Sequence, residues 1–99
     1  MNMQAMLRQA QNLQKEMLKT KDEIDKTEFT GENGFVKITA NGSKKVTKVE
    51  ISKEMDLSSD DLEVLEDMIL LAINDVNKKI DDVTEKKMGK YTNGMPGLF

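Results

Sequence analysis

The stretch that decides the fold runs from Phe35 to Ile51 and reads FVKITANGSKKVTKVEI. Phe35–Ala40 alternates apolar and polar side chains with the two-residue period of a strand. Asn41-Gly42 follows, and both residues tolerate the positive φ of a type I′ turn. Lys44–Ile51 has the composition of the partner strand. The stretch therefore predicts an antiparallel β-hairpin.

A further strand is expected immediately before this hairpin. Residues 27–30 have strand composition, and Gly31–Gly34 reads as a turn. The sequence thus predicts a three-stranded antiparallel meander with one apolar and one polar face. The polar face carries Lys37, Lys48 and Glu50, and the apolar face, covered by helices, carries Val36, Ile38, Ala40, Val49 and Ile51.

Residues 3–26 precede the sheet and predict one long amphipathic helix. No glycine or proline interrupts them, and their apolar positions recur with alternating spacings of three and four. This spacing is typical of the seam of a helix that pairs with another helix, although an ordinary surface helix lying on its own sheet remains open. The seam is rich in methionine, which packs adaptably.

A second long helix is expected after the sheet, from about Ser59 to Met88. Ser58 suits the N-cap, with Asp61 completing an approximate capping box. Gly89 is expected to end the helix at the C′ position. The fold class is therefore α/β in the α+β sense, with a single domain over residues 1–90 and a flexible tail over residues 91–99.

Helix length and strand length do not match. Helices of this length are about 36–45 Å long, whereas strands of six to eight residues span only about 20–27 Å. The helices must overhang the sheet, and the apolar seams continue into the overhang, so we expect a two-fold homodimer to cover them. The candidate core and dimer seam comprises Met6, Ala10, Leu13, Met17, Leu65, Ile69, Ala72 and Val76.

Composition argues against an enzyme. The chain has 99 residues, no cysteine and no histidine, which removes disulfides, thiolate metal sites and the commonest general base. Neither a phosphate loop around Gly89-Lys90 nor a calcium loop from Asp56 meets its required pattern. We expect no metal, cofactor or small-molecule substrate. The longest apolar run, Met68–Ile73, is too short for a membrane span, and no export signal is visible, so a cytoplasmic protein is expected.

Charge is unevenly distributed. The net charge is −3, yet residues 54–75 carry eight acidic side chains and no basic one. Residues 1–53 hold ten bases and seven acids, and residues 76–99 hold five bases and three acids. A mildly acidic protein can therefore present basic surfaces, although the same charges could simply solvate helix faces.

Several segments, in order, are typical of one known family. They are residues 6–17 (MLRQAQNLQKEM), 29–32 (FTGE), 36–42 (VKITANG), 65–69 (LEDMI), 72–76 (AINDV), 87–90 (KMGK) and 94–99 (GMPGLF). Through these segments the chain resembles the YbaB/EbfC family of bacterial nucleoid-associated DNA-binding proteins. The turn at Asn33-Gly34 is shorter than in many relatives, which leaves the length of the first hairpin open.

The resemblance implies a tweezer-like homodimer that binds double-stranded DNA in the nucleoid, with roles in nucleoid organisation and in gene regulation or recombination and repair. Lysine and arginine contacts to phosphates are the simplest mechanism, and they carry little sequence preference. An alternative is a helical adaptor whose methionine-rich seams dock a partner protein. The candidate DNA-binding residues are Arg8, Lys15, Lys19, Lys78, Lys79, Lys86, Lys87 and Lys90.

Overall fold

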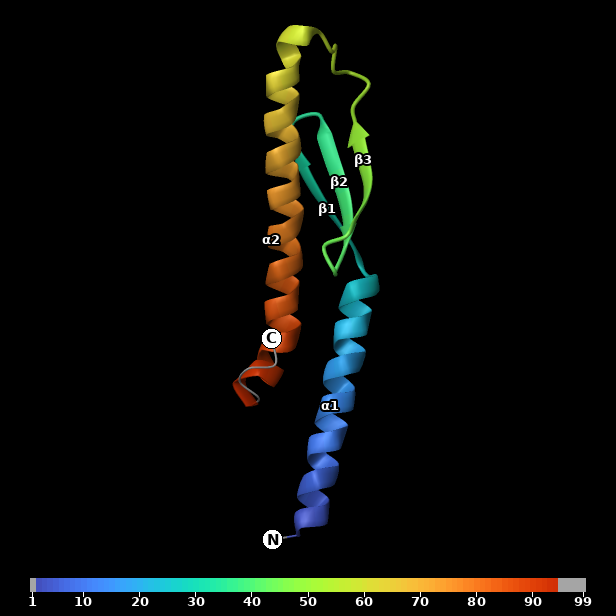
Figure 1. Ribbon diagram of the computed structural model, residues 1–99, viewed down its shortest axis with the longest axis vertical. Coiled ribbons are helices and arrows are strands. Elements are labelled where there is room, and N and C mark those ends of the chain that lie inside the picture. The colour runs from blue at the N-terminus through green and yellow to red at the C-terminus, as the bar shows by residue number, and fades with distance from the viewer. Residues whose placement is uncertain (1, 95–99) are drawn as a thin grey trace.

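The computed structural model describes residues 2–94 as two long helices and one small sheet (Figure 1). The predicted fold class, with a helix on either side of a three-stranded antiparallel meander in the sequence, is confirmed. The elements are α1 (Met3–Lys26), β1 (Glu28–Asn33), β2 (Val36–Asn41), β3 (Val46–Ile51), the 3₁₀ turn η1 (Ser59–Asp61) and α2 (Leu62–Gly94).

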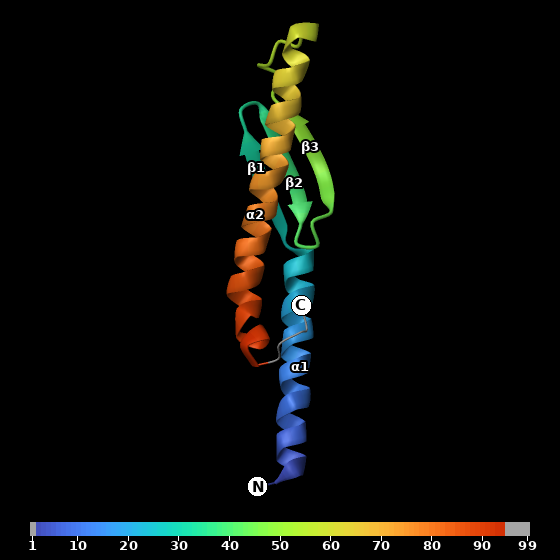
Figure 2. The ribbon, with the colours of Figure 1, turned by 60° about the vertical axis from the view of Figure 1, so that its left-hand side comes forward.

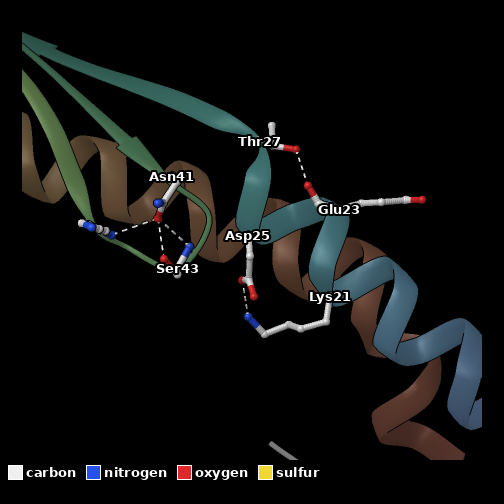
Figure 3. Close-up of polar contacts among 7 residues, drawn as sticks. Lys21, Glu23, Asp25, Thr27, Asn41 and Ser43 are labelled. Carbon is white, nitrogen blue, oxygen red and sulfur yellow. Dashed lines mark hydrogen bonds and ion pairs between the residues drawn. The ribbon is translucent and has the colours of Figure 1, made fainter.

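Helix α1 has the bounds that its periodicity predicts. The Asn2 side chain accepts a hydrogen bond of 3.0 Å from the backbone N–H of Gln4 and so caps the first turn. At the other end Thr27 leaves the helix in extended geometry, while its hydroxyl donates to the Glu23 carbonyl oxygen at 2.7 Å (Figure 3). The chain therefore passes from α1 into β1 without a loop.

The first hairpin is tighter than predicted. The expectation of a turn over Gly31–Gly34 is wrong, because β1 continues through Asn33 and only Gly34 and Phe35 form the turn. Gly34 supplies the positive φ, at 57°. Gly31 serves a different purpose: a Cβ there would overlap the Ala72 carbonyl oxygen of α2, so glycine lets the helix lie close to the strand.

The second hairpin is not the predicted two-residue turn. The positive φ, 68°, belongs to Lys44, and the Asn41 side-chain oxygen accepts from the backbone N–H groups of Ser43 and Lys45, both at 3.1 Å (Figure 3). Strand β3 accordingly begins at Val46. The role of Gly42 is steric, because a Cβ would overlap the Ile24 carbonyl oxygen at the end of α1.

The main core lies between α2 and two of the three strands. Helix α2 packs against β1 and β2, and the fully buried side chains are Val36, Ile38, Ala40, Ala72, Val76 and Ile80. The registers of β2 and β3 place Val49 opposite Ile38 and Ile51 opposite Val36, on the predicted face. The prediction that helices cover Val49 and Ile51 is wrong for the single chain, since they remain 52% and 39% exposed.

Helix α2 is longer than predicted. It continues through Gly89 to Gly94, so the expected stop at Gly89 and the expectation of a loose segment from Tyr91 are wrong. Tyr91 is only 1% exposed. A mid-helix glycine costs about 1 kcal/mol, which is less than the gain of about 1.5–3 kcal/mol from burying a large side chain. The rest of the predicted tail, 95–99, lies outside the described residues.

The molecule is elongated, with extents of 71 × 19 × 14 Å. Both views show α1 continuing far beyond the sheet, so the predicted overhang is present (Figures 1 and 2). A second, separate apolar cluster of Met17, Ile24, Met88 and Tyr91 joins α1 to the last turns of α2. No helix within residues 2–94 is long and apolar enough to cross a membrane.

Candidate nucleic-acid interface

The basic residues of α1 form one stripe. Arg8, Lys15 and Lys19 are separated by seven and four residues, which places them on a single helix face. Lys15 and Lys19 lie two residues either side of the buried Met17. Two residues turn an α-helix by about 200°, so both lysines point away from the contact with α2.

The basic residues at the end of α2 follow the same rule. Lys86 and Lys90 lie two residues either side of the buried Met88, and they therefore face away from α1. The Lys90 ammonium lies 5.0 Å from the centre of the Tyr91 ring, a cation–π distance. The region where α1 and the last turns of α2 pack together, the helix crossing, thus carries exposed cations on both outer sides. Apolar side chains lie between the two helices.

Lys79 is held by the sheet rather than facing solvent freely. Its ammonium donates 2.9 Å to the Thr30 carbonyl oxygen on the outer edge of β1 and pairs with Asp75 at 3.2 Å. Asp75 in turn accepts from the Glu32 N–H at 3.1 Å, so the two side chains cap the free edge of β1. The Glu32 hydrogen bond, followed by Lys79, lowers the pKa of Asp75 below its usual value.

The structure separates the eight predicted cations into groups. All eight are exposed, and Lys79 is the one among them that forms an ion pair with another described residue. The contact between α1 and the end of α2 carries Lys15 and Lys19 on one outer side and Lys86 and Lys90 on the other. Lys87 follows Lys86, Arg8 lies further out on α1, and Lys78 adjoins Lys79 beside the sheet.

Most of the acidic stretch, residues 54–67, lies at the opposite end of the molecule. The connector after β3 and the first turns of α2 form the end furthest from the N-terminus of α1 (Figure 1). There the Asp61 carboxylate accepts hydrogen bonds from the Ser58 N–H at 3.1 Å and from the Ser58 hydroxyl at 3.0 Å. The first of these is one of the two hydrogen bonds that define the predicted capping box. The acidic residues 54–67 are therefore spatially separate from the cations near residues 15–19 and 86–90.

The surface of residues 2–94 also carries a hollow beside the first turn, and its carboxylates form no cluster of metal ligands. Within residues 2–94 no group of three or more histidine, cysteine, aspartate or glutamate side chains is arranged to hold a metal ion. This hollow is open to solvent and lies between Glu32, Phe35, Glu50 and Glu54. Of its polar groups, Glu50 has a pKa lowered by its hydrogen bond to Lys48 and is thus a stable anion rather than a proton donor.

Comparison with known proteins gives the family. The model of the YbaB/EbfC DNA-binding family matches residues 1–95. The chain belongs to the YbaB/EbfC DNA-binding family. The resemblance in its sequence segments is thereby confirmed, and so is the expectation of a family associated with DNA and the nucleoid.

Relatives within the YbaB/EbfC family cover almost the whole chain. The chain is 43% identical to a nucleoid-associated protein of Ligilactobacillus salivarius, over 99% of this chain and 95% of the relative. It is 41% identical to a nucleoid-associated protein of Enterococcus faecalis, over 98% and 94%. The crystal structure of uncharacterized protein HP0035 from Helicobacter pylori matches with a TM-score of 0.74 at 17% identity, covering 92% of this chain and 97% of that one. This last match supports the fold alone.

The predicted seam divides into covered and uncovered parts. Met17, Ala72 and Val76 are buried, and Leu65 and Ile69 are half-buried against the core. The half of α1 that precedes Met17 projects beyond the contact with α2, and its seam residues Met6, Ala10 and Leu13 are exposed. Sequence reasoning missed Tyr91 at the contact with α1, although Tyr91 extends the stripe of Ile80, Thr84 and Met88 with helical spacing.

Proposed function

We propose that this YbaB/EbfC protein binds double-stranded DNA as a homodimer, through phosphate contacts made by the cations around the crossing of α1 and α2. The observation that carries the proposal is the outward position of Lys15, Lys19, Lys86 and Lys90 around the buried Met17 and Met88. We place the protein in the bacterial nucleoid, in the cytoplasm, with a non-enzymatic role in nucleoid organisation and in gene regulation or recombination and repair.

The homodimer is supported by apolar side chains that one chain leaves uncovered. The inner face of β3 has no helix over it, and Val46, Val49 and Ile51 are 39–52% exposed. Leu70 and Leu71 of α2 are at least half exposed. A two-fold arrangement in which α2 of each chain covers β3 of the other would bury both sets and double the basic surface.

Phosphate contact also accounts for the type of cation present. Seven of the eight candidates are lysines, which bind phosphate as point charges, and Arg8 is the only arginine in the chain. Bidentate recognition of guanine by arginine is therefore scarce, and little sequence preference is expected. The two helices are long and separated by strands, unlike a helix-turn-helix unit.

A salt titration of DNA binding tests the proposal. If about six phosphates are neutralised, the logarithm of the association constant falls with the logarithm of salt at a slope near −5. Lys86→Glu with Lys87→Glu should weaken binding and reduce the slope, while sizing should still give a dimer. Binding that is insensitive to salt, or a dilute monomer with full affinity, would contradict the proposal.

An adaptor role is the second candidate, and one observation favours it. Met3, Met6 and Leu7 are 50–82% exposed on the projecting half of α1, as a docking helix requires. A stoichiometric protein partner, together with no DNA retardation at low salt, would support the adaptor role. Steeply salt-dependent retardation would support DNA binding instead.

A further inference from the structure

The contact between α1 and α2 is a small apolar cluster centred on Tyr91. Met17 and Ile24 come from α1, and Met88 and Tyr91 come from the end of α2. This cluster is distinct from the core that α2 forms with the sheet. The two can therefore lose their packing separately, and α1 could detach while the sheet and α2 remain folded.

Tyr91 also makes a polar contact across the crossing. Its hydroxyl lies 3.4 Å from the Thr20 hydroxyl, a hydrogen bond between residues 71 positions apart in the sequence. The Lys90 ammonium lies over its ring. One side chain thus contacts α1 through its ring and hydroxyl, and it fixes the position of a cation that we assign to the DNA surface.

The projecting half of α1 acts as a lever on this contact. Residues 2–16 are all exposed, and the buried residues of α1 are Met17 and Ile24. Met3 therefore lies about 21 Å beyond Met17 along the helix. A rotation of about 10° at the crossing would displace the tip by about 4 Å, which is comparable with the axial rise of about 3.4 Å per phosphate on one DNA strand.

We propose that Tyr91 is a positioning residue for DNA binding. It latches α1 against α2 at a fixed angle, so that Arg8 and Lys15 on one outer side keep a fixed position relative to Lys86 and Lys90 on the other. Without the latch, α1 samples a range of angles and only a fraction of molecules presents the bound arrangement. This inference rests on the proposed DNA binding, whereas the latch itself can be measured without DNA.

The latch is tested by a distance within one chain. Because the chain has no cysteine, Gln9→Cys on the exposed part of α1 and Lys37→Cys on the outer face of β2 give two unique spin-label positions. Labelled protein is diluted with unlabelled protein, so that only distances within a chain are recorded. We expect a narrow distribution for the parent protein, a broad one for Tyr91→Ala, and a smaller broadening for Tyr91→Phe and Thr20→Val.

DNA affinity separates positioning from charge. If a tenth of the Tyr91→Ala molecules hold the bound arrangement, affinity falls about 10-fold, and the salt slope stays unchanged because the same cations remain. Lys86→Glu with Lys87→Glu, the matched control, lowers the slope instead. Circular dichroism of each variant monitors the sheet core, and if Tyr91→Ala does not fold, Tyr91→Phe and Thr20→Val carry the test.

Two results would overturn the inference. One is a distance distribution as narrow in the folded latch variants as in the parent. The other is a broadened distribution with unchanged DNA affinity, which would make the latch structural only. Failure of the parent protein to bind DNA would instead overturn the proposed function, and the distance measurement would still decide whether Tyr91 holds α1.

Discussion

Gly42 shows how one residue can match a sequence pattern for a different physical reason. Asn-Gly predicts a hairpin, and a hairpin forms, but the left-handed backbone belongs to Lys44. Gly42 is needed because the Ile24 carbonyl oxygen of α1 occupies the space of a Cβ. That contact joins residues far apart in the sequence, so no local pattern could have predicted it.

Gly42→Ala should therefore destabilise the protein. Overpacking of a tight site costs about 1–3 kcal/mol, and here the obstacle is backbone that cannot turn aside. Gly89→Ala is the matched control: apart from its chain neighbours and its own helix backbone, no atom of the described residues lies within 4 Å of the added Cβ. Alanine in place of a mid-helix glycine should stabilise α2 by up to about 1 kcal/mol. Urea unfolding of both variants measures this, and equal stabilities would refute the steric role of Gly42.

The lowered pKa of Asp75 predicts that acid removes the stabilisation this side chain gives to the β1 edge. Its hydrogen bond from Glu32, and then Lys79, lower its pKa in the folded protein. The stabilisation is thus present above the pKa of the unfolded chain, whose ordinary value is 3.8, and is lost as the pH falls through the lower folded value. Below about pH 4, the urea midpoint of the parent protein should decrease with falling pH more steeply than the urea midpoint of Asp75→Asn does. Parallel pH profiles would contradict this role.

At the scale of elements, periodicity predicts what each segment is, and contacts between elements decide where it ends. The bounds of α1 and the existence of the three-stranded meander follow from local spacing, but the bounds of the strands do not. The predicted end of α2 at Gly89 failed because Tyr91 packs on α1 and continues the helix. The predicted turn at Gly31 failed because α2 needs that glycine for close approach to β1. Both glycines carry the local pattern of a break, and packing overrides it.

Strand β3 carries the element-scale prediction. Val49 faces the side that one chain leaves uncovered, and in the proposed dimer it is buried, whereas Lys48 faces the opposite side. Val49→Gln should raise the dimer dissociation constant at least about 10-fold, because each chain buries an amide without a partner at a cost of about 1–3 kcal/mol. Lys48→Gln should leave it unchanged. Sedimentation over a dilution series measures both, and equal dissociation constants would exclude β3 from the interface.

At the scale of the whole molecule, the sequence shows the charge blocks but not their geometry. Acidic residues 54–75 and the cations near residues 15–19 and 86–90 are separate in the chain, and the fold places the first acids and these cations far apart. The sequence could not have separated Lys79 from the other cations, because its partners on β1 are brought to it by the sheet. It also could not have shown which sides of the crossing face solvent.

This separation predicts how the acidic end affects DNA binding. Glu63 and Lys86 are 23 residues apart on one helix, or about 35 Å, whereas the screening length is about 8 Å at 0.15 M salt and about 30 Å at 0.01 M. Asp60→Asn with Glu63→Gln and Glu66→Gln should leave DNA affinity unchanged at 0.15 M and strengthen it at 0.01 M. Lys86→Glu with Lys87→Glu should weaken binding at both concentrations, because contact charges act within the screening length. Should the three neutralised acids change affinity at 0.15 M as strongly as the two reversed lysines, DNA must contact the acidic end, and the assignment of the interface to the helix crossing would be wrong.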